Sequence, residues 1–187
     1  IAAVAEVRSV LLVSRRPLAE IRSVAVDVNS RTSVALLRLL LAARGLEPAF
    51  TPAPPAVDQM LAAHDAALLI GDPALAVDRD RVHVLDLAAA WRELTGLPFV
   101  FAVWAATAEG LRPGLAELLA ESFAIGRREL PQIVSEAANA TGLPAPVLRD
   151  YFTRHLRYPL GPDELAGLAE FHRRAHAHGL IASLPAC

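Results

Sequence analysis

The sequence contains no lysine and only one cysteine. All 18 basic residues are Arg, which indicates a bias in genomic composition and excludes Schiff-base catalysis by a lysine. The single thiol, Cys187, cannot form an internal disulfide. The chain is therefore not a small disulfide-stapled secreted domain, and we expect a reducing, cytoplasmic compartment.

The charge balance and the hydropathy pattern exclude two further classes of protein. The net charge is -2, and the arginines are scattered along the chain rather than gathered in a basic stripe, which argues against a nucleic-acid partner. The longest apolar run, residues 97–106, has about half of the roughly 20 residues that a membrane helix needs. With 187 residues, 54% of them hydrophobic, the chain can form one domain or two small lobes.

Short apolar runs alternate with helical patterns through the first hundred residues. Strands are predicted at residues 9–14, 23–28, 66–70, 82–85 and 99–105. Helices are predicted at residues 30–45, 56–64 and from about 86 to 96, and residues 52–55 are predicted as a Pro-rich turn. This alternation predicts an α/β fold with a mostly parallel or mixed sheet, flanking helices and a ligand site beyond the carboxyl ends of the strands.

The remainder of the chain is predicted to be helical only. The expected helices cover residues 113–139, 146–155 and 162–179, and the Gly- and Pro-containing stretches 142–146 and 159–162 separate them.

One polar motif, Asn29-Ser30-Arg31-Thr32-Ser33, lies between a predicted strand and a strongly amphipathic helix. Its hydroxyls and free backbone N–H groups can hold a carboxylate or phosphate at the positive end of the helix dipole. Simple N-capping is the alternative, but capping needs only one of these hydroxyls. The sequence therefore predicts an anion site or a cap here.

A second candidate is Gly71-Asp72, directly after a predicted strand. Gly71 allows a ligand to approach the backbone closely, whereas Asp72 is interpreted first as a cap for a helix that begins at Pro73. Asp27 ends another strand, where it can serve as an acid or base or accept turn hydrogen bonds. The sequence does not separate these two roles for Asp27.

The histidines are weak candidates for catalysis or metal binding. His172, His176 and His178 have ligand-like spacing, but Arg173 and Arg174 beside them repel a cation, so a solvated helix face is favoured. The isolated His64 and His83 are interpreted as residues at the ends of elements. The sequence contains no G-x-S-x-G, G-x-G-x-x-G or P-loop motif.

Several stretches together resemble a known family. They are Ser9-Val-Leu-Leu-Val-Ser-Arg15, Ser30-Arg-Thr-Ser-Val-Ala-Leu-Leu-Arg38, Asp65-Ala-Ala-Leu-Leu-Ile-Gly-Asp72 and Leu94-Thr-Gly-Leu-Pro-Phe-Val-Phe-Ala-Val-Trp104. Their order and spacing are similar to those of the MqnA family of menaquinone biosynthesis, chorismate dehydratase, from about residue 8 to residue 181.

The resemblance implies a two-lobed fold similar to type II periplasmic solute-binding proteins, with the substrate in the cleft. Residues 1–15 would then hold a hinge-proximal strand, residues 16–102 the crossover lobe, and residues 103–187 the hinge return and the C-terminal helices of the first lobe. The implied reaction eliminates water from chorismate to give 3-[(1-carboxyvinyl)oxy]benzoate, in the futalosine route to menaquinone, without a metal or organic cofactor. The implied substrate-binding residues are Ser9, Ser30, Arg31, Thr32, Ser33, Gly71 and Asp72, and no general base is assigned.

The sequence departs from the family pattern at its beginning. Family members start with a segment carrying an Ile-Pro-Tyr-Leu-Asn type motif, which supplies the opposite wall of the cleft, and this motif does not occur here. We therefore expect a fragment without that part of the first lobe. Self-association through exposed apolar faces then becomes an alternative, which leaves a homodimer open.

Two other functions are weighed against the dehydratase. One is the sister family that makes 1,4-dihydroxy-6-naphthoate, which the sequence of residues 30–33 and 99–104 fits less well. The other is a non-catalytic solute-binding module that captures an anionic metabolite with the same hydroxyl cluster. Because the sequence starts at Ile1, a cleaved secretion signal, which would favour the binding module, stays open.

Overall fold

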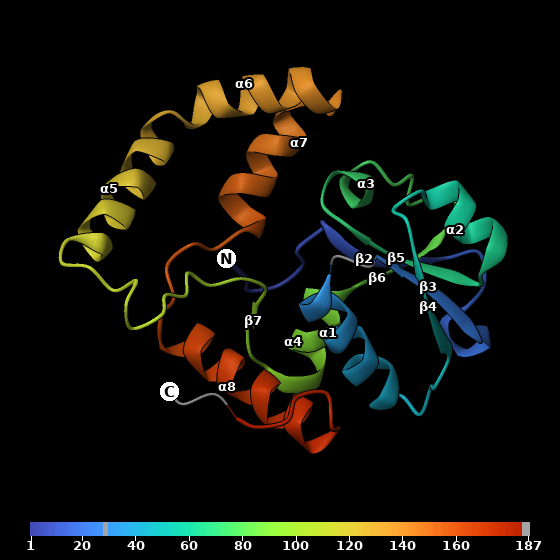
Figure 1. Cartoon of the computed structure of the whole chain (residues 1–187). Helices are drawn as coiled ribbons and strands as arrows, with labels where there is room; N and C mark the ends of the chain where they lie inside the picture. Colours follow the sequence, from blue (N-terminus) through green and yellow to red (C-terminus); the bar gives the residue numbers. More distant parts are fainter. Residues whose placement is uncertain (28–29, 185–187) are drawn as a thin grey trace. The chain divides into compact units, whose positions relative to one another are not determined.

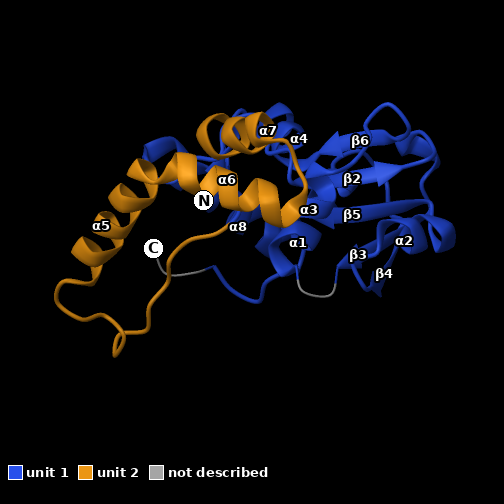
Figure 2. Ribbon diagram, turned by 90° about the horizontal axis from the view of Figure 1, so that it is seen from above, with its two compact units in different colours: residues 1–101, 155–187 blue, residues 102–154 orange. Residues whose placement is uncertain are grey.

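The computed structural model describes residues 1–27 and 30–184, which fold into two compact units (Figure 1). The first unit comprises residues 1–101 together with the chain from residue 155 onward, and the second comprises residues 102–154 (Figure 2).

The first unit is built on a five-stranded sheet. Its strands lie in the spatial order β4 (Ala49–Ala53), β3 (Ser23–Asp27), β5 (Ala66–Ile70), β2 (Val10–Ser14) and β6 (His83–Asp86). The strands β4, β3 and β5 are parallel, but β2 is antiparallel to both β5 and β6. The sheet is therefore mixed, in agreement with the predicted parallel or mixed sheet, because β2 runs against the other four strands.

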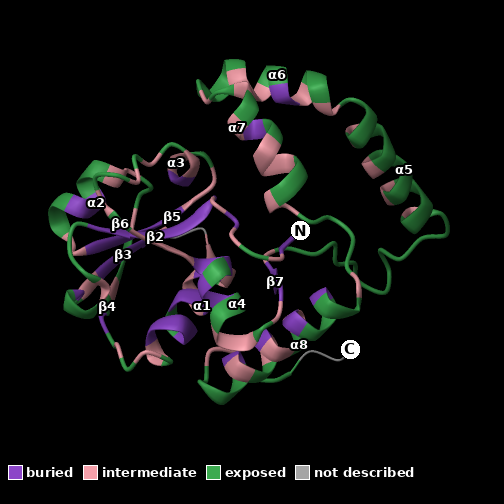
Figure 3. Ribbon diagram, turned by 180° about the vertical axis from the view of Figure 1, so that it is seen from behind, coloured by how far each residue is buried: buried purple, intermediate pink, exposed green. Residues whose placement is uncertain are grey.

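Apolar residues on both faces of the central strands explain why the sheet is buried. Val10 and Leu12 of β2 belong to a cluster formed with α1 (Arg31–Ala42), α4 (Leu87–Thr95) and α8 (Pro162–Ala177). The alternating residues Leu11 and Val13 belong to a second cluster with α2 (Val57–Ala63) and α3 (Asp72–Leu75). Successive side chains of a strand point to opposite faces, so an uninterrupted apolar run is the pattern of a strand covered on both sides. Figure 3 shows this burial along β2, β5 and α1.

The last two residues of β4 lie in the stretch 52–55 that the sequence predicts as a Pro-rich turn. The strand pairs with β3 along its whole length, and Pro52 lies opposite Val26. Proline is tolerated there because β4 is an edge strand, where one side of the backbone needs no ladder partner. The turn prediction is therefore wrong for residues 52 and 53.

A second, two-stranded sheet pairs β1 (Ala2–Ala3) with β7 (Phe99–Val100). The predicted strand at residues 99–105 is thus much too long, because β1 offers only two residues as ladder partners. Beyond it the chain is exposed, with Trp104 84% accessible. Behind β7 a cluster of edge-to-face aromatic rings joins Trp91, Phe99 and Phe171, so β7 and α8 share one core with α4.

The second unit is helical. It contains α5 (Leu115–Arg128), α6 (Leu130–Thr141), α7 (Ala145–Asp150) and most of a π-helical turn, Tyr151–His155. The predicted helix 113–139 is divided at Glu129, because Pro131 lacks the N–H that a continuous helix would require and fits only the first turn of α6. Among the described residues, no helix is long and apolar enough to cross a membrane.

Candidate functional site

Several strand ends meet at one edge of the five-stranded sheet. The register pairs Val26 with Leu68, Val10 with Ile70 and Leu11 with Asp86. The carboxyl ends of β3, β5 and β6 therefore lie at the same edge as the beginning of β2. Ligands of open α/β sheets bind beyond the carboxyl ends of strands, so this edge is the candidate site.

Two of the predicted site residues, Ser9 and Gly71, are in direct contact at this edge. The backbone N–H of Gly71 donates to the carbonyl oxygen of Ser9 at 2.8 Å, and Ser9 is buried. Gly71 has a φ of 72°, a conformation that glycine adopts without strain, and a Cβ built on it would meet nothing within 4 Å. The open space beside this backbone is what a close approach by a ligand requires.

The hydroxyl motif forms the beginning of α1. Ser30 is its N-cap residue, but no side-chain hydroxyl makes the capping bond, so the capping alternative is wrong for the described residues. Thr32 is half-buried, Ser33 is buried and Arg31 is exposed. The first N–H groups of a helix have no partner within it and carry its positive dipole. This end of α1 therefore keeps donors for an anion. The Asn29 of the motif lies outside the described residues.

The structure also corrects the role predicted for Asp72. The helix α3 begins at Asp72 rather than at Pro73, Gly71 is the N-cap residue, and no side chain caps this helix. Asp72 is exposed in the first turn, where its negative charge is favourable to the helix dipole. Asp27 ends β3, and its carbonyl oxygen accepts the N–H of Ser30 at 3.2 Å.

Asp86, which the sequence did not single out, connects three segments at the same edge. Its carboxylate accepts the N–H groups of Ala88 and Ala89 and so caps α4. The same carboxylate accepts the N–H groups of Val7 and Arg8, almost eighty residues earlier. An aspartate that directly precedes an amphipathic helix is a cap signal, but nothing local in the sequence indicates its contact with residues 7 and 8.

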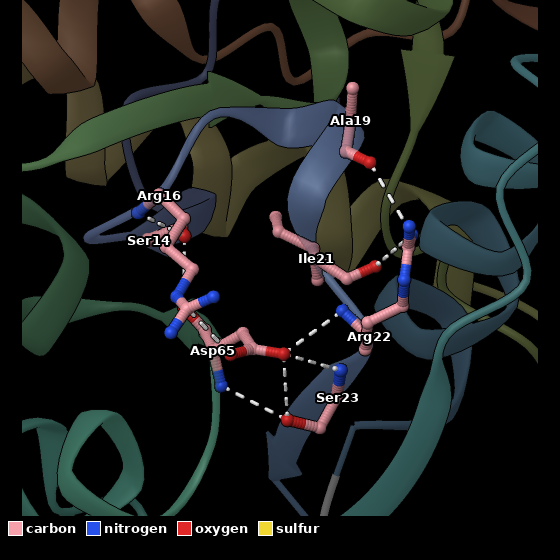
Figure 4. Close-up of polar contacts among 7 residues, drawn as sticks. All are labelled: Ser14, Arg16, Ala19, Ile21, Arg22, Ser23 and Asp65. Carbon is pink, nitrogen blue, oxygen red and sulfur yellow. Dashed lines mark hydrogen bonds and ion pairs between the residues drawn. The ribbon is translucent and has the colours of Figure 1, made fainter.

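A different carboxylate, Asp65, holds the opposite edge of the sheet together (Figure 4). It accepts the N–H groups of Arg22 at 2.9 Å and Ser23 at 3.1 Å, and the hydroxyl of Ser23 at 3.2 Å. These hydrogen bonds, first that from the Arg22 backbone, together with the nearby Arg16 guanidinium, hold the pKa of the Asp65 carboxyl below its ordinary value. This cluster fixes the starts of β3 and β5, not the candidate site.

No metal centre is found in the part of the chain that the structure describes. No group of three His, Cys, Asp or Glu side chains there is placed to hold an ion. His172 and His176 lie on α8, where His176 is exposed. His64 is the C-cap residue of α2 and His83 begins β6, so both are at element ends as predicted.

A cavity of about 470 Å³ lies on the face of the sheet covered by α2 and α3. Val13, Arg15 and Leu61 are among the residues that line it, and none of the seven predicted site residues does. This cavity is therefore separate from the candidate site at the sheet edge.

Comparisons with known proteins converge on one family. A family model described as menaquinone biosynthesis matches residues 1–177. The chorismate dehydratase of Thermus thermophilus is 33% identical to this chain over an alignment of 198 positions. The alignment covers 96% of this chain and 71% of the relative.

The fold is similar to that of a solved structure. The crystal structure of protein AF1704 from Archaeoglobus fulgidus aligns with a TM-score of 0.68 over 96% of this chain and 71% of that protein, at 22% identity. This likeness supports the overall arrangement of strands and helices alone.

Proposed function

Because the chain belongs to the menaquinone biosynthesis family, we propose that it is a chorismate dehydratase, a carbon-oxygen lyase. The proposal is supported by the identity to a relative of that name and by one feature of the site. That feature is the uncapped beginning of α1 at the sheet edge that also carries the Ser9–Gly71 contact.

The chemistry asked of the site is modest. A proton leaves a ring carbon of chorismate, the bond from the ring to the hydroxyl oxygen breaks, and water departs while a benzene ring forms. The gain of aromaticity drives the elimination, so the protein has to hold the ring hydrogen and the leaving hydroxyl in position. No electrons are exchanged with an external partner, and the proposal invokes no metal or organic cofactor.

The substrate carries two carboxylates, and the site offers neutral donors together with one guanidinium. We assign Ser30, Thr32, Ser33 and the N–H groups around them to one carboxylate, because a helix N-terminus favours a negative charge. Arg31 is exposed beside them and adds positive charge. Ser9, Gly71 and Asp72 form the mouth next to this helix end. Neutral N–H and O–H donors hold the carboxylate by hydrogen bonds and do not transfer a proton to it.

We also propose a type II periplasmic-binding-protein-like architecture, with residues 16–102 as the crossover lobe, residues 1–15 as the hinge-proximal strand leading into it and residues 103–187 returning from it. The futalosine route and a cytoplasmic location follow from the proposed reaction, and neither a homodimer nor a non-catalytic solute-binding role is needed for it. The 1,4-dihydroxy-6-naphthoate alternative is not favoured by the relative found.

Binding and turnover are tested separately. The purified chain is titrated with chorismate in a calorimeter, and the same sample is then analysed by mass spectrometry for a product lighter by one water. Binding with product formation is the expected result. Binding without product would favour the solute-binding module, and the absence of both, with the Thermus thermophilus enzyme active in parallel, would overturn the proposal.

A further inference from the structure

The carboxylate of Asp86 accepts backbone N–H groups from two different segments of the chain. Its Oδ1 atom accepts the N–H of Ala88 at 3.0 Å and that of Ala89 at 3.2 Å, which caps α4. Its Oδ2 atom accepts the N–H of Arg8 at 2.7 Å, and both oxygens lie 3.1 Å from the N–H of Val7. A cap needs one oxygen, so the second oxygen has a separate task.

That second oxygen stabilises an unusual backbone conformation. Among the described residues, Arg8 is the only one other than glycine with a positive φ, 65°. The left-handed region is unfavourable for a residue with a Cβ, and it persists where neighbouring groups over-determine it. The short bond from the Arg8 N–H to a carboxylate is charge-assisted and therefore strong. Asp86 holds Arg8 in this conformation.

The residue after Arg8 is Ser9, whose carbonyl oxygen accepts the N–H of Gly71. The conformation of Arg8 therefore determines how the chain passes through Ser9 into β2 and how Ser9 meets Gly71. The side chain of Arg92 donates to the carbonyl oxygen of Val4 at 3.2 Å, so α4 holds the incoming segment at a second point. The N-terminal turn of α4 is thereby coupled to the candidate site through the backbone.

We propose that Asp86 is a positioning residue that sets the Ser9–Gly71 side of the substrate site through the backbone of Arg8. The inference rests on the proposed dehydratase function where the test measures activity. It rests on the backbone geometry alone where the test measures hydrogen exchange. Asp86 itself does not touch the reacting atoms.

The test compares Asp86→Asn with Asp65→Asn. The amide of Asp86→Asn retains one oxygen for the cap of α4 but turns an N–H donor towards the N–H of Arg8. Asp65→Asn is the matched control, because that carboxylate also holds two backbone N–H groups but at the opposite edge of the sheet. Both variants are expected to have a lower melting temperature than the parent.

The two variants are expected to differ at the site. Asp86→Asn should lower kcat/KM for chorismate by about tenfold to a hundredfold, the loss typical of a misplaced site, while Asp65→Asn stays within about twofold, a change too small to indicate lost positioning. Adding Arg8→Gly to Asp86→Asn should restore part of the loss, since glycine adopts the positive φ without a supporting bond. Equal kcat/KM in the two variants would make Asp86 a cap only and overturn the inference.

A second measurement does not depend on catalysis. Hydrogen exchange of the Gly71 N–H, which is bonded to Ser9, should become faster in Asp86→Asn than in the parent and stay unchanged in Asp65→Asn. Faster exchange in a chain that forms no product would refute the proposed function and support the positioning role. Unchanged exchange in Asp86→Asn would refute the positioning role even in an active enzyme.

Discussion

Gly167 of α8 lies directly against the carbonyl oxygen of Pro98, so that a Cβ built on Gly167 would overlap that oxygen. The same carbonyl accepts the indole N–H of the buried Trp91 at 3.2 Å. The absence of a side chain at position 167 is therefore what allows α8 to close the aromatic core against β7.

Gly167→Ala is expected to destabilise the fold, because either α8 or the backbone at Pro98 must move. Overpacking of this kind costs about 1–3 kcal/mol. Urea denaturation measures the loss. Gly126→Ala in α5 is the matched control, since a Cβ there meets nothing within 4 Å and alanine in a helix is favoured over glycine by about 0.5–1 kcal/mol. A stability of Gly167→Ala equal to that of the parent would contradict the close packing.

Thr32→Val is expected to weaken chorismate binding by about tenfold, the effect of losing one hydrogen bond to a charged group. Stability should stay unchanged, because the Thr32 hydroxyl has no partner among the described residues. Thr95→Val should lower stability and leave chorismate binding unchanged. The Thr95 hydroxyl is remote from the site, and it donates to the carbonyl oxygen of Trp91 at 2.8 Å. Calorimetry and thermal melts separate the two effects, and equal affinity of Thr32→Val and parent would remove Thr32 from the site.

The Asp65 cluster predicts a pH dependence of stability. Because the pKa of Asp65 in the folded chain lies below its ordinary value of 3.8, its stabilisation is fully present above that value and is lost as the pH falls through the lowered pKa. Asp65→Asn should therefore unfold more easily than the parent at neutral pH. The free energies of unfolding of the two proteins should converge in acid, and a constant difference down to acid pH would contradict the prediction.

Glu170 of α8 is expected to titrate far below an ordinary glutamate. Arg173 and Arg174 each donate to it at 2.7 Å, and the Arg173 hydrogen bond contributes most in lowering its pKa from 4.5 to about 2. Its contribution to stability is present above pH 4.5 and lost between there and about 2. The pairs are solvent-accessible, so Glu170→Gln should cost about 0.2–1 kcal/mol at neutral pH. Carbon NMR of the carboxylate measures the pKa, and a value near 4.5 would contradict these contacts.

Much of the sheet could be predicted because its signals are local. The strands β2, β3 and β5 are short apolar runs, and each is buried on both faces. The edge strand β4 could not be predicted because it contains Pro52, which normally indicates a turn. The end of the strand at Phe99 could not be predicted because its length is limited by its partner β1, and no local pattern carries that information.

The candidate site could be predicted only in part. The sequence points to Ser9, residues 30–33 and Gly71 as candidates, and the sheet topology brings Ser9 and Gly71 into contact at one edge. Their role in binding stays a prediction. The capping roles of Ser30 and Asp72 were wrong, because backbone geometry at a helix end is not determined by the presence of a suitable side chain. The contact of Asp86 with Arg8 could not be predicted, since the two residues are 78 positions apart in the sequence.

The proposed dehydratase activity is measured by incubating the purified chain with chorismate and following the product by mass spectrometry and ultraviolet absorbance. The expected product is lighter than chorismate by one water and has the absorbance of a newly formed benzene ring, and it forms more slowly in Thr32→Val. Unchanged chorismate, under conditions in which the Thermus thermophilus dehydratase converts it, would show that this chain is not a chorismate dehydratase.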